Sequence, residues 1–402
     1  MADANFTSTD ILIAGAGPTA YAASLEAAAC GYDVTLVAPK GTPIDDDART
    51  TALMRPGVAL LQDFGVWDAI APETAPLQVL RIVDATGRLL RAPTVDFHAQ
   101  ETGADEFGFN IPNRVLNARL ADAVDEHARV TIVDAMVSAV AFDDDAAHAT
   151  LSNGKTYEAK LVVGADGVQS LVRRAAEIGE RTWAYPQTAI VCAFDHERSH
   201  NGVSAEFHTK EGPFTQVPLP GNRSSLVWVM KPENVDGVLA LEPEALAAAI
   251  EKNLQHTLGA ISNVSKPQPW PLSTLVANKF GGDRVMLVGH AAHAFPPIGA
   301  QGLNLGFRDI EDLGAVLEDA HANGRDPGAA KTTQAYDRRR RADIYVRTGA
   351  VDALNRSLLT DLLPVQAVRA VGLSALKNVS PLRTLFMREG VQPGSGLRSL
   401  FT

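Results

Sequence analysis

The residues near the N-terminus that are best suited to chemistry are two glycines and an alanine in DILIAGAGPTAYAASLEAAACGYDVTLVA. Gly15, Gly17 and Ala20 fill the spacing G-x-G-x-x-[GA]. In this pattern the first glycine allows a tight turn, the second lets backbone approach a pyrophosphate, and the third small residue lets helix and strand pack closely. Pro18 opens the next helix, whose positive N-terminus would face the phosphates. The pattern predicts a dinucleotide site, with an ordinary structural turn as the alternative.

The strand after this helix, residues 33–37, is not followed by the usual acidic residue. That acid commonly binds the ribose hydroxyls of the adenosine half of a dinucleotide. Here Ala38, Pro39 and Lys40 stand at this point. We expect the site to be weakened and not abolished, because the backbone contacts to the phosphates do not depend on the acid. Lys40 either faces the adenosine or its phosphate, or is simply solvated.

Two later segments also have the strand–loop–helix form that brings backbone close to a flat, phosphorylated ligand. In AKLVVGADGVQSLVRRAA, Asp166 and Gly167 follow a strand, where ligands of open α/β sheets bind. The pair is also an ordinary turn sequence, and Ser170 is predicted to cap the following helix. In DRVMLVGHAAHAFPPIGAQGLNLGFRDIEDL, an apolar strand leads through the loop 296–302 into a helix. Here His293 is predicted to be a satisfied core histidine, not a catalytic one.

The composition is that of a globular protein with more than one domain. The chain has 402 residues, of which 46% are hydrophobic and 21% are charged, and single cores stop growing at about 250–300 residues. The net charge of −11 argues against nucleic-acid binding. The two cysteines, Cys30 and Cys192, predict neither a disulfide framework nor a zinc site, and no metal site is expected. The sequence shows no secretory signal and no apolar run long enough for a spanning helix.

Taken together, the three segments resemble the FAD-dependent aromatic hydroxylases of the para-hydroxybenzoate hydroxylase fold. Within that family the chain is most similar to the ubiquinone-biosynthesis hydroxylases, through DARTTAL, IPNRVLNARL, GPFTQVPLP, SSLVW and FPPIGAQGLNLGFRDIEDL. The resemblance implies an α/β fold with a Rossmann-like FAD-binding domain (GR2-type). An antiparallel β-sheet substrate domain would be inserted into it, and a helical C-terminal tail would follow.

The expected FAD-binding domain is discontinuous, with residues 1–75, 100–180 and 275–330. The β-rich substrate domain would comprise residues 76–99 and 181–274, and the helical C-terminal region residues 331–402. Hairpins are expected around Thr86–Gly87 and around Asn153–Gly154, where the turn residues favour tight reversals. Short strands between residues 189 and 230 suit an antiparallel sheet that covers the flavin.

The resemblance also assigns roles to single residues. Gly15, Gly17, Pro18 and Ala20 would hold the FAD pyrophosphate, and Asp166 would lie beside the FAD and the path of the nicotinamide. Arg49 and Arg114 would reach the phosphate and ribityl region, where an arginine fork suits phosphate, although both could instead form surface ion pairs. The isoalloxazine would be lined by Pro297, Gly299, Gln301, Gly302, Leu303 and Asn304, the first three as the catalytic residues. Asn304 could also be a helix cap.

The chemistry implied is that of the cofactor. NAD(P)H or another reductant would reduce FAD. O₂ would then form a C4a-hydroperoxyflavin that hydroxylates an aromatic ring, which we expect to be a polyprenylated phenol. No second glycine fingerprint occurs, so the NAD(P)H would dock transiently without a Rossmann domain of its own. The protein would have to exclude water from the flavin.

One residue departs from the family pattern G-D-A-A-H, because His290 stands where the acid would accept hydrogen bonds from the ribityl chain. A neutral imidazole still accepts one hydrogen bond and donates another, so His290 remains compatible with FAD. With Ala38 it nevertheless raises a rival interpretation, a flavin-poor, non-catalytic relative that serves as a scaffold in a quinone-biosynthesis complex. The intact loop PPIGAQGLNLG favours the flavoenzyme.

The C-terminal region is basic, with 12 Lys or Arg against 5 Asp or Glu from residue 331 onward. Its segment RSLLTDLLPVQAVRAVGLSALKNVSPLRTLF mixes leucine with arginine and suits a contact with an anionic membrane surface. The default alternative is a helix packed on the body. We expect a cytoplasmic protein, peripheral to the inner membrane if the first alternative holds, with a place in a ubiquinone-biosynthesis complex.

Overall fold

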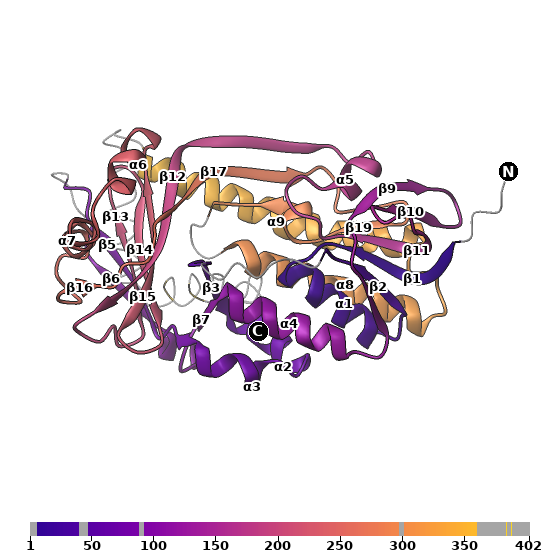
Figure 1. Ribbon diagram of the computed structural model, residues 1–402, viewed down its shortest axis with the longest axis horizontal. Coiled ribbons are helices and arrows are strands. Elements are labelled where there is room, and N and C mark those ends of the chain that lie inside the picture. Colours follow the sequence, from indigo (N-terminus) through magenta and orange to yellow (C-terminus); the bar gives the residue numbers. More distant parts are fainter. Residues whose placement is uncertain are drawn as a thin grey trace.

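The computed structural model describes residues 6–39, 47–87, 92–296 and 301–359, together with Arg383 and Met387. Three sheets organise this part of the chain. An eight-stranded sheet and a nine-stranded sheet lie at opposite ends of the molecule, with a small three-stranded sheet between them (Figure 1). The mixed α/β architecture, with its Rossmann-like part and its large mainly antiparallel sheet, agrees with the expected fold class.

The eight-stranded sheet has the order β18-β19-β11-β1-β2-β8, in which β18 is antiparallel to β19. Its strands are β1 (Thr7–Ala14), β2 (Val34–Val37), β8 (Val130–Val133), β9 (Val137–Phe142), β10 (Ala147–Leu151), β11 (Thr156–Gly164), β18 (Gly281–Gly282) and β19 (Val285–Leu287). Four central pairs, β1–β11, β1–β2, β2–β8 and β11–β19, are parallel. Because strands such as β1 are buried at their carboxyl ends, they read in the sequence as continuous apolar runs.

Helices cover this sheet and complete its core. They are α1 (Pro18–Ala29), α4 (Asn113–Glu126), α5 (Leu171–Ala175), α8 (Gln301–Ala322) and α9 (Ala330–Leu359). Residues of α1, α4, α8 and α9 join those of the strands in one large hydrophobic cluster. The hairpin expected around Asn153–Gly154 is present, since β10 pairs with β11 and Gly154 has a φ of 82°.

The nine-stranded sheet has the order β20-β17-β12-β15-β14-β13-β5-β6, with β16 beside β12. Its strands are β5 (Val79–Asp84), β6 (Val95–His98), β12 (Glu180–His196), β13 (Val203–His208), β14 (Pro213–Leu219), β15 (Arg223–Met230), β16 (Ile261–Ser262), β17 (Gln268–Ala277) and β20 (His293–Ala294). Helices α6 (Pro232–Leu239) and α7 (Pro243–Asn253) lie at the end of the molecule that this sheet forms. The strands from β12 to β15 are antiparallel as expected, but β5 pairs with β13 in parallel.

An antiparallel hairpin follows β5 as expected, but its described return strand is β6, which starts at Val95. Residues 88–91, where the return strand was expected to begin, lie outside the described part. The Asp84 carboxylate accepts hydrogen bonds from the backbone N–H of Thr86 and from that of Ala92, on either side of this gap.

The three-stranded sheet comprises β3 (Thr50–Met54), β7 (Gly108–Pro112) and β4 (Ala75–Pro76). The short helices around it are α2 (Arg55–Asp63), α3 (Trp67–Ile70), η1 (Ala71–Glu73) and η2 (Ala99–Thr102). The Oγ1 of Thr50 lies 2.9 Å from the Oγ of Ser225, which joins β3 to β15. On its other side, β3 is hydrogen-bonded to Asn304 of α8, so the small sheet lies between the nine-stranded sheet and a helix that packs on the eight-stranded sheet.

The described residues of the C-terminal region pack on the body. Helix α9 runs along α8, and further on Met387 is buried beside Val95 and Phe97. The guanidinium of Arg383 lies 4.8 Å from the centre of the Phe97 ring and pairs with Glu101. The rest of the segment expected to contact a membrane lies outside the described residues. No helix in the described ranges combines the length and apolarity needed to cross a membrane.

Candidate active site

The glycine turn lies where β1 and β11 end side by side. In the parallel register Ala14 is paired with Gly164, so the turn after β1 meets the turn after β11. Gly15 has a φ of 144°, and a Cβ there would lie 2.3 Å from the carbonyl oxygen of Ala165. A residue with a side chain would therefore force the two turns apart. Gly17 is the N-cap of α1, and no atom lies within 4 Å of its Cβ position.

Asp166, in the second turn, has one oxygen in use and one without a partner. Its Oδ2 accepts hydrogen bonds from the backbone N–H groups of Leu171 (2.7 Å) and Val172 (3.1 Å). Its Oδ1 is buried and has no hydrogen-bond partner among the described residues. Such an orphaned acceptor costs free energy unless a donor reaches it. Ser170 caps α5 by accepting from the N–H of Arg173, as predicted.

His290 belongs to the third turn, η3 (Gly289–Ala291), which follows β19. Gly289 has a φ of 57°, and its Cβ position lies 2.8 Å from the Oγ1 of Thr19 in α1. This contact brings the histidine turn to the start of α1. The His290 side chain is exposed to solvent. Its pKa is nevertheless lowered, first by desolvation from the surrounding protein atoms and then by the nearby His293 and Arg49.

A buried network of charged side chains holds this third turn in place. The Nε2 of His293 lies 2.7 Å from the Oδ2 of Asp309, and the same oxygen accepts from the N–H of Gly289 at 2.8 Å. The other oxygen of Asp309 accepts from the Nε of Arg340 at 2.6 Å. All three side chains are at most 1% exposed. His293 is thus a core histidine, as predicted, although its Nδ1 has no partner among the described residues.

Arg173 ties the second turn to the third. It is 2% exposed, and its two terminal nitrogens donate to the carbonyls of Ala291 (2.7 Å) and Val168 (2.8 Å). It also pairs with Glu180. No role was predicted for Arg173, Asp309 or Arg340. Their residue types were visible in the sequence, Arg340 in a run of four arginines, but the type alone does not reveal the distant partner.

The proline- and glycine-rich loop is described only in part. Pro297, Gly299 and Ala300 lie outside the described residues, as does the side chain of Gln301. Gly302 has open space at its Cβ position, and Leu303 is half-buried.

Asn304 is not a helix cap, because it lies inside α8 and binds strand β3. Its Nδ2 donates to the carbonyl of Ala52 and its Oδ1 accepts from the N–H of Met54, both at 2.8 Å. This contact positions the start of α8 against the small sheet.

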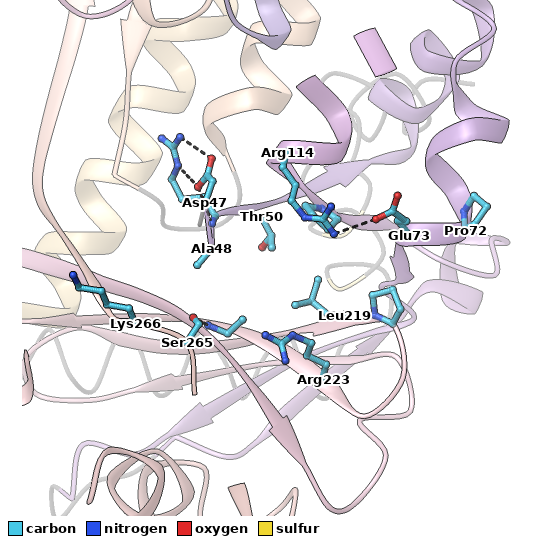
Figure 2. Close-up of a pocket in the computed structure, with 14 residues that line it drawn as sticks. Asp47, Ala48, Thr50, Pro72, Glu73, Arg114, Leu219, Arg223, Ser265 and Lys266 are labelled. Carbon is cyan, nitrogen blue, oxygen red and sulfur yellow. Dashed lines mark hydrogen bonds and ion pairs between the residues drawn. The ribbon is translucent and has the colours of Figure 1, made fainter. Parts of the chain in front are cut away.

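Arg49 and Arg114 both form ion pairs, as in the alternative considered for them. The Nε and Nη2 of Arg49 contact the two oxygens of Asp47 at 2.7 and 2.8 Å, and its guanidinium lies 5.0 Å from the centre of the Trp270 ring. Arg114 Nη2 lies 3.1 Å from an oxygen of Glu73, and both of these side chains are exposed. Figure 2 shows the cavity of about 640 Å³ that both arginines line. The three turns do not line it. Lys40 lies outside the described residues.

The family follows from the comparison with known proteins. A family model described as "FAD binding domain" matches residues 8–347. The chain belongs to this family. It is an FAD-dependent monooxygenase, as its matches to curated hydroxylases and to a solved monooxygenase structure also indicate.

The chain is 37% identical over 346 residues to ubiquinone hydroxylase UbiL of Rhodospirillum rubrum, covering 86% of this chain and 80% of that protein. It is 30% identical over 382 residues to 3-demethoxyubiquinol 3-hydroxylase of Escherichia coli, covering 93% and 96%. The structure of p-nitrophenol 4-monooxygenase PnpA from Pseudomonas putida aligns with a TM-score of 0.77 at 18% identity, covering 98% of this chain and 99% of that one. This last match shows the shared fold.

The site of this monooxygenase fits a dinucleotide. Open space at Gly17, the close approach of Gly15 to Ala165, the unpartnered Oδ1 of Asp166 and the exposed side chain of His290 all lie where β1, β11 and β19 end. Parallel strands place such turns at one edge, which is where open α/β sheets bind ligands. Among the residues that the structure describes, no group of three or more His, Cys, Asp or Glu is placed to hold a metal ion.

Proposed function

We propose that this monooxygenase hydroxylates the aromatic ring of a polyprenylated phenol in ubiquinone biosynthesis. The observation that carries the proposal is the similarity to 3-demethoxyubiquinol 3-hydroxylase over nearly the full length of both chains. The three converging turns, with open space at Gly17 and a free oxygen on Asp166, support FAD as the cofactor. NAD(P)H as the reductant and O₂ as the oxygen source are part of the proposal.

In this proposal the three turns hold the cofactor. Gly15, Gly17, Pro18 and Ala20 offer backbone and the N-terminus of α1 to the pyrophosphate. The Oδ1 of Asp166 and the ring of His290 would accept or donate hydrogen bonds to its sugar-derived hydroxyl groups. Arg49 and Arg114 would supply positive charge once they turn from their carboxylate partners.

The start of α8 would bind the isoalloxazine end of FAD, where the reaction takes place. When bound, FAD supplies the electrons and the activation of O₂ needed to transfer one oxygen atom. The N–H groups of Gly302, Leu303 and Asn304, at a helix N-terminus, would stabilise negative charge there. We place the ring-lining role with these residues and with Pro297, Gly299 and Gln301.

The nine-stranded sheet would bind the phenol and its apolar tail. Ser225 contacts Thr50, so the face of the sheet that carries Ser225 faces β3. Val217 is paired with Ser225 and Val227 follows two residues later, so both side chains share that face. An apolar surface at this position would accommodate a prenylated ring and exclude water.

Two measurements test the proposal in sequence. The purified protein is titrated with FAD and its visible absorption spectrum is recorded. The loaded protein is then incubated with NAD(P)H, O₂ and a polyprenylated phenol, and products are analysed by mass spectrometry. We expect a flavin spectrum and a product heavier by one oxygen atom, which carries ¹⁸O when ¹⁸O₂ is used. No flavin binding at high FAD would favour the scaffold interpretation, and flavin binding without hydroxylation of any phenol tested would reject the substrate class.

A further inference from the structure

The cavity of Figure 2 separates two walls that both carry cations. Arg49 and Arg114 belong to the wall formed by β3, β7 and the start of α4. Arg223 starts β15 of the nine-stranded sheet, and Lys266 lies in the connection just before β17 of the same sheet. In Figure 2 the side chains of Arg114 and Arg223 extend toward the space between the walls. The cavity of about 640 Å³ is large enough for a ligand of small-molecule size.

The two walls differ in whether the carboxylates that pair with their cations also line the cavity. On the first wall, Arg49 pairs with Asp47 and Arg114 pairs with Glu73, and both of these carboxylates line the cavity. On the sheet wall, Arg223 pairs with Asp195, which does not line it. The Lys266 ammonium forms no ion pair with a described residue, and the side chain is exposed. The lining thus has four cations and two anions in a protein whose net charge is −11.

Arg223 and Arg114, on opposite walls, each have N–H donors that their ion pairs do not use. Arg223 contacts Asp195 through Nη1 alone, and a guanidinium has five N–H donors in a fixed fork. Arg114, across the cavity, contacts Glu73 through Nη2 alone. Forked donors and a mobile ammonium are the groups that bind phosphate oxygens best. A local excess of positive charge on an acidic protein also attracts anions from solution.

We propose that this cavity binds a phosphate-bearing anion, with Arg223 and Lys266 as its principal ligands. Neither Gly15 nor Gly17 of the pyrophosphate cradle lines the cavity. Arg49 and Arg114, which the proposed function assigns to FAD, line its first wall, so the new site is placed on the sheet wall with Arg223 and Lys266. The phosphate has two possible sources: the diphosphate of a soluble dinucleotide, or the headgroup of an anionic lipid. The soluble dinucleotide would be the NAD(P)H reductant, and this version of the proposal rests on the proposed function. The version with a lipid headgroup does not depend on the proposed function.

The test uses full-length protein loaded with FAD. Binding of ADP-ribose is measured by isothermal titration calorimetry. Binding to phosphatidylcholine vesicles, with and without phosphatidylglycerol, is measured by sedimentation. The double variant Arg223→Gln/Lys266→Gln is compared with the control Lys155→Gln/Lys279→Gln, which removes the same charge from exposed positions outside the cavity. We expect the first pair to weaken binding about tenfold or more, since two charge-assisted contacts are lost, and the control pair to leave it unchanged.

Each outcome has a defined meaning. Loss of ADP-ribose binding in the cavity variant supports the proposal with a dinucleotide source, and loss of phosphatidylglycerol-dependent binding supports it with a lipid source. Binding of neither probe by the unmodified protein overturns the proposal, as does equal binding by the cavity variant and the control. A cavity variant that also loses FAD overturns it too, because the sheet-wall cations would then belong to the flavin site. FAD titration and thermal unfolding of each variant separate these cases from misfolding.

Discussion

Arg173 Nη1 donates a hydrogen bond to the backbone carbonyl of Ala291 at a distance of 2.7 Å. These residues lie on two different turns of the cofactor site, one after β11 and the other after β19. The guanidinium also contacts the carbonyl of Val168 and the carboxylate of Glu180, so one buried side chain sets the spacing of the two turns. The relative position of Asp166 and His290 therefore depends on the buried side chain of Arg173, which contacts both turns.

We expect Arg173→Lys to destabilise the protein by about 2 kcal/mol and to weaken FAD binding, because an ammonium cannot reproduce the fork that reaches two carbonyls. Urea unfolding and FAD titration measure the two effects. Arg174→Lys is the matched control, because Arg174 is the exposed neighbour on the same short helix. Equal effects of the two substitutions would contradict the role of Arg173.

We expect Gly17→Glu to abolish FAD binding while the protein stays folded. The backbone at Gly17 is extended, with a φ of −147°, and the Cβ position meets no other atom. A side chain therefore fits the fold, but a carboxylate would repel the pyrophosphate at the N-terminus of α1. The visible spectrum after FAD titration reports binding, and circular dichroism reports folding. Retention of flavin would show that the pyrophosphate lies elsewhere.

Replacing His290 by aspartate should tighten FAD binding by about fivefold, the equivalent of one hydrogen bond of ~1 kcal/mol. The carboxylate offers two acceptor atoms near Arg49, whereas the neutral imidazole offers one. His290→Asn is the control, since it has the shape without the charge. Fluorescence quenching of FAD gives both dissociation constants. If neither variant differs from the unmodified protein, His290 does not contact the cofactor.

Asp309→Asn should cost about 3 kcal/mol of stability, because it leaves the buried Arg340 without its closest carboxylate and weakens the contact to His293. Urea unfolding measures the difference. The control is Asp319→Asn on the same helix, where the carboxylate is exposed and pairs with Arg325. Such an exposed pair contributes about 0–1 kcal/mol. Similar losses for both variants would show that the buried network is not what stabilises the third turn.

Glu26 should make the protein less stable as the pH rises. Burial, followed by Asp63, Glu318 and Glu311, raises its pKa from 4.5 to about 7. Between these two values the folded protein holds a proton that the unfolded chain has released, so stability falls as the pH increases through this window. Glu26→Gln should therefore raise the Tm at pH 8 and change it little at pH 4.5. Glu126→Gln, an exposed control at the end of α4, should shift the Tm at neither pH.

Local patterns predicted the parts of the fold that depend on neighbours in sequence. The turn at Gly15, the cap at Ser170 and the hairpin at Asn153–Gly154 each require particular residue types at fixed spacing. The parallel pairing of β5 with β13 was not predicted, because it joins residues that are far apart in the chain.

The site residues show the same limit. The roles of Arg173 and Asp309 depend on partners that only the folded chain brings together, such as Ala291 and Arg340. Asn304 carries a helix-capping residue type, yet its amide binds β3. In each case the side chain's type was visible in the sequence, while the atom it contacts was set by tertiary structure.

The pairing of β11 with β19 has a consequence for the order of events on the ribosome. Translation adds about 5–20 residues per second, and N-terminal segments leave the ribosome first. The strand β1 and the turn at Gly15 emerge early, but the turn that bears His290 must wait until β19, at residues 285–287, has been synthesised. The nascent chain therefore cannot assemble the proposed flavin cradle until more than two thirds of its length exists. Loading with cofactor belongs to the end of synthesis or to the released protein.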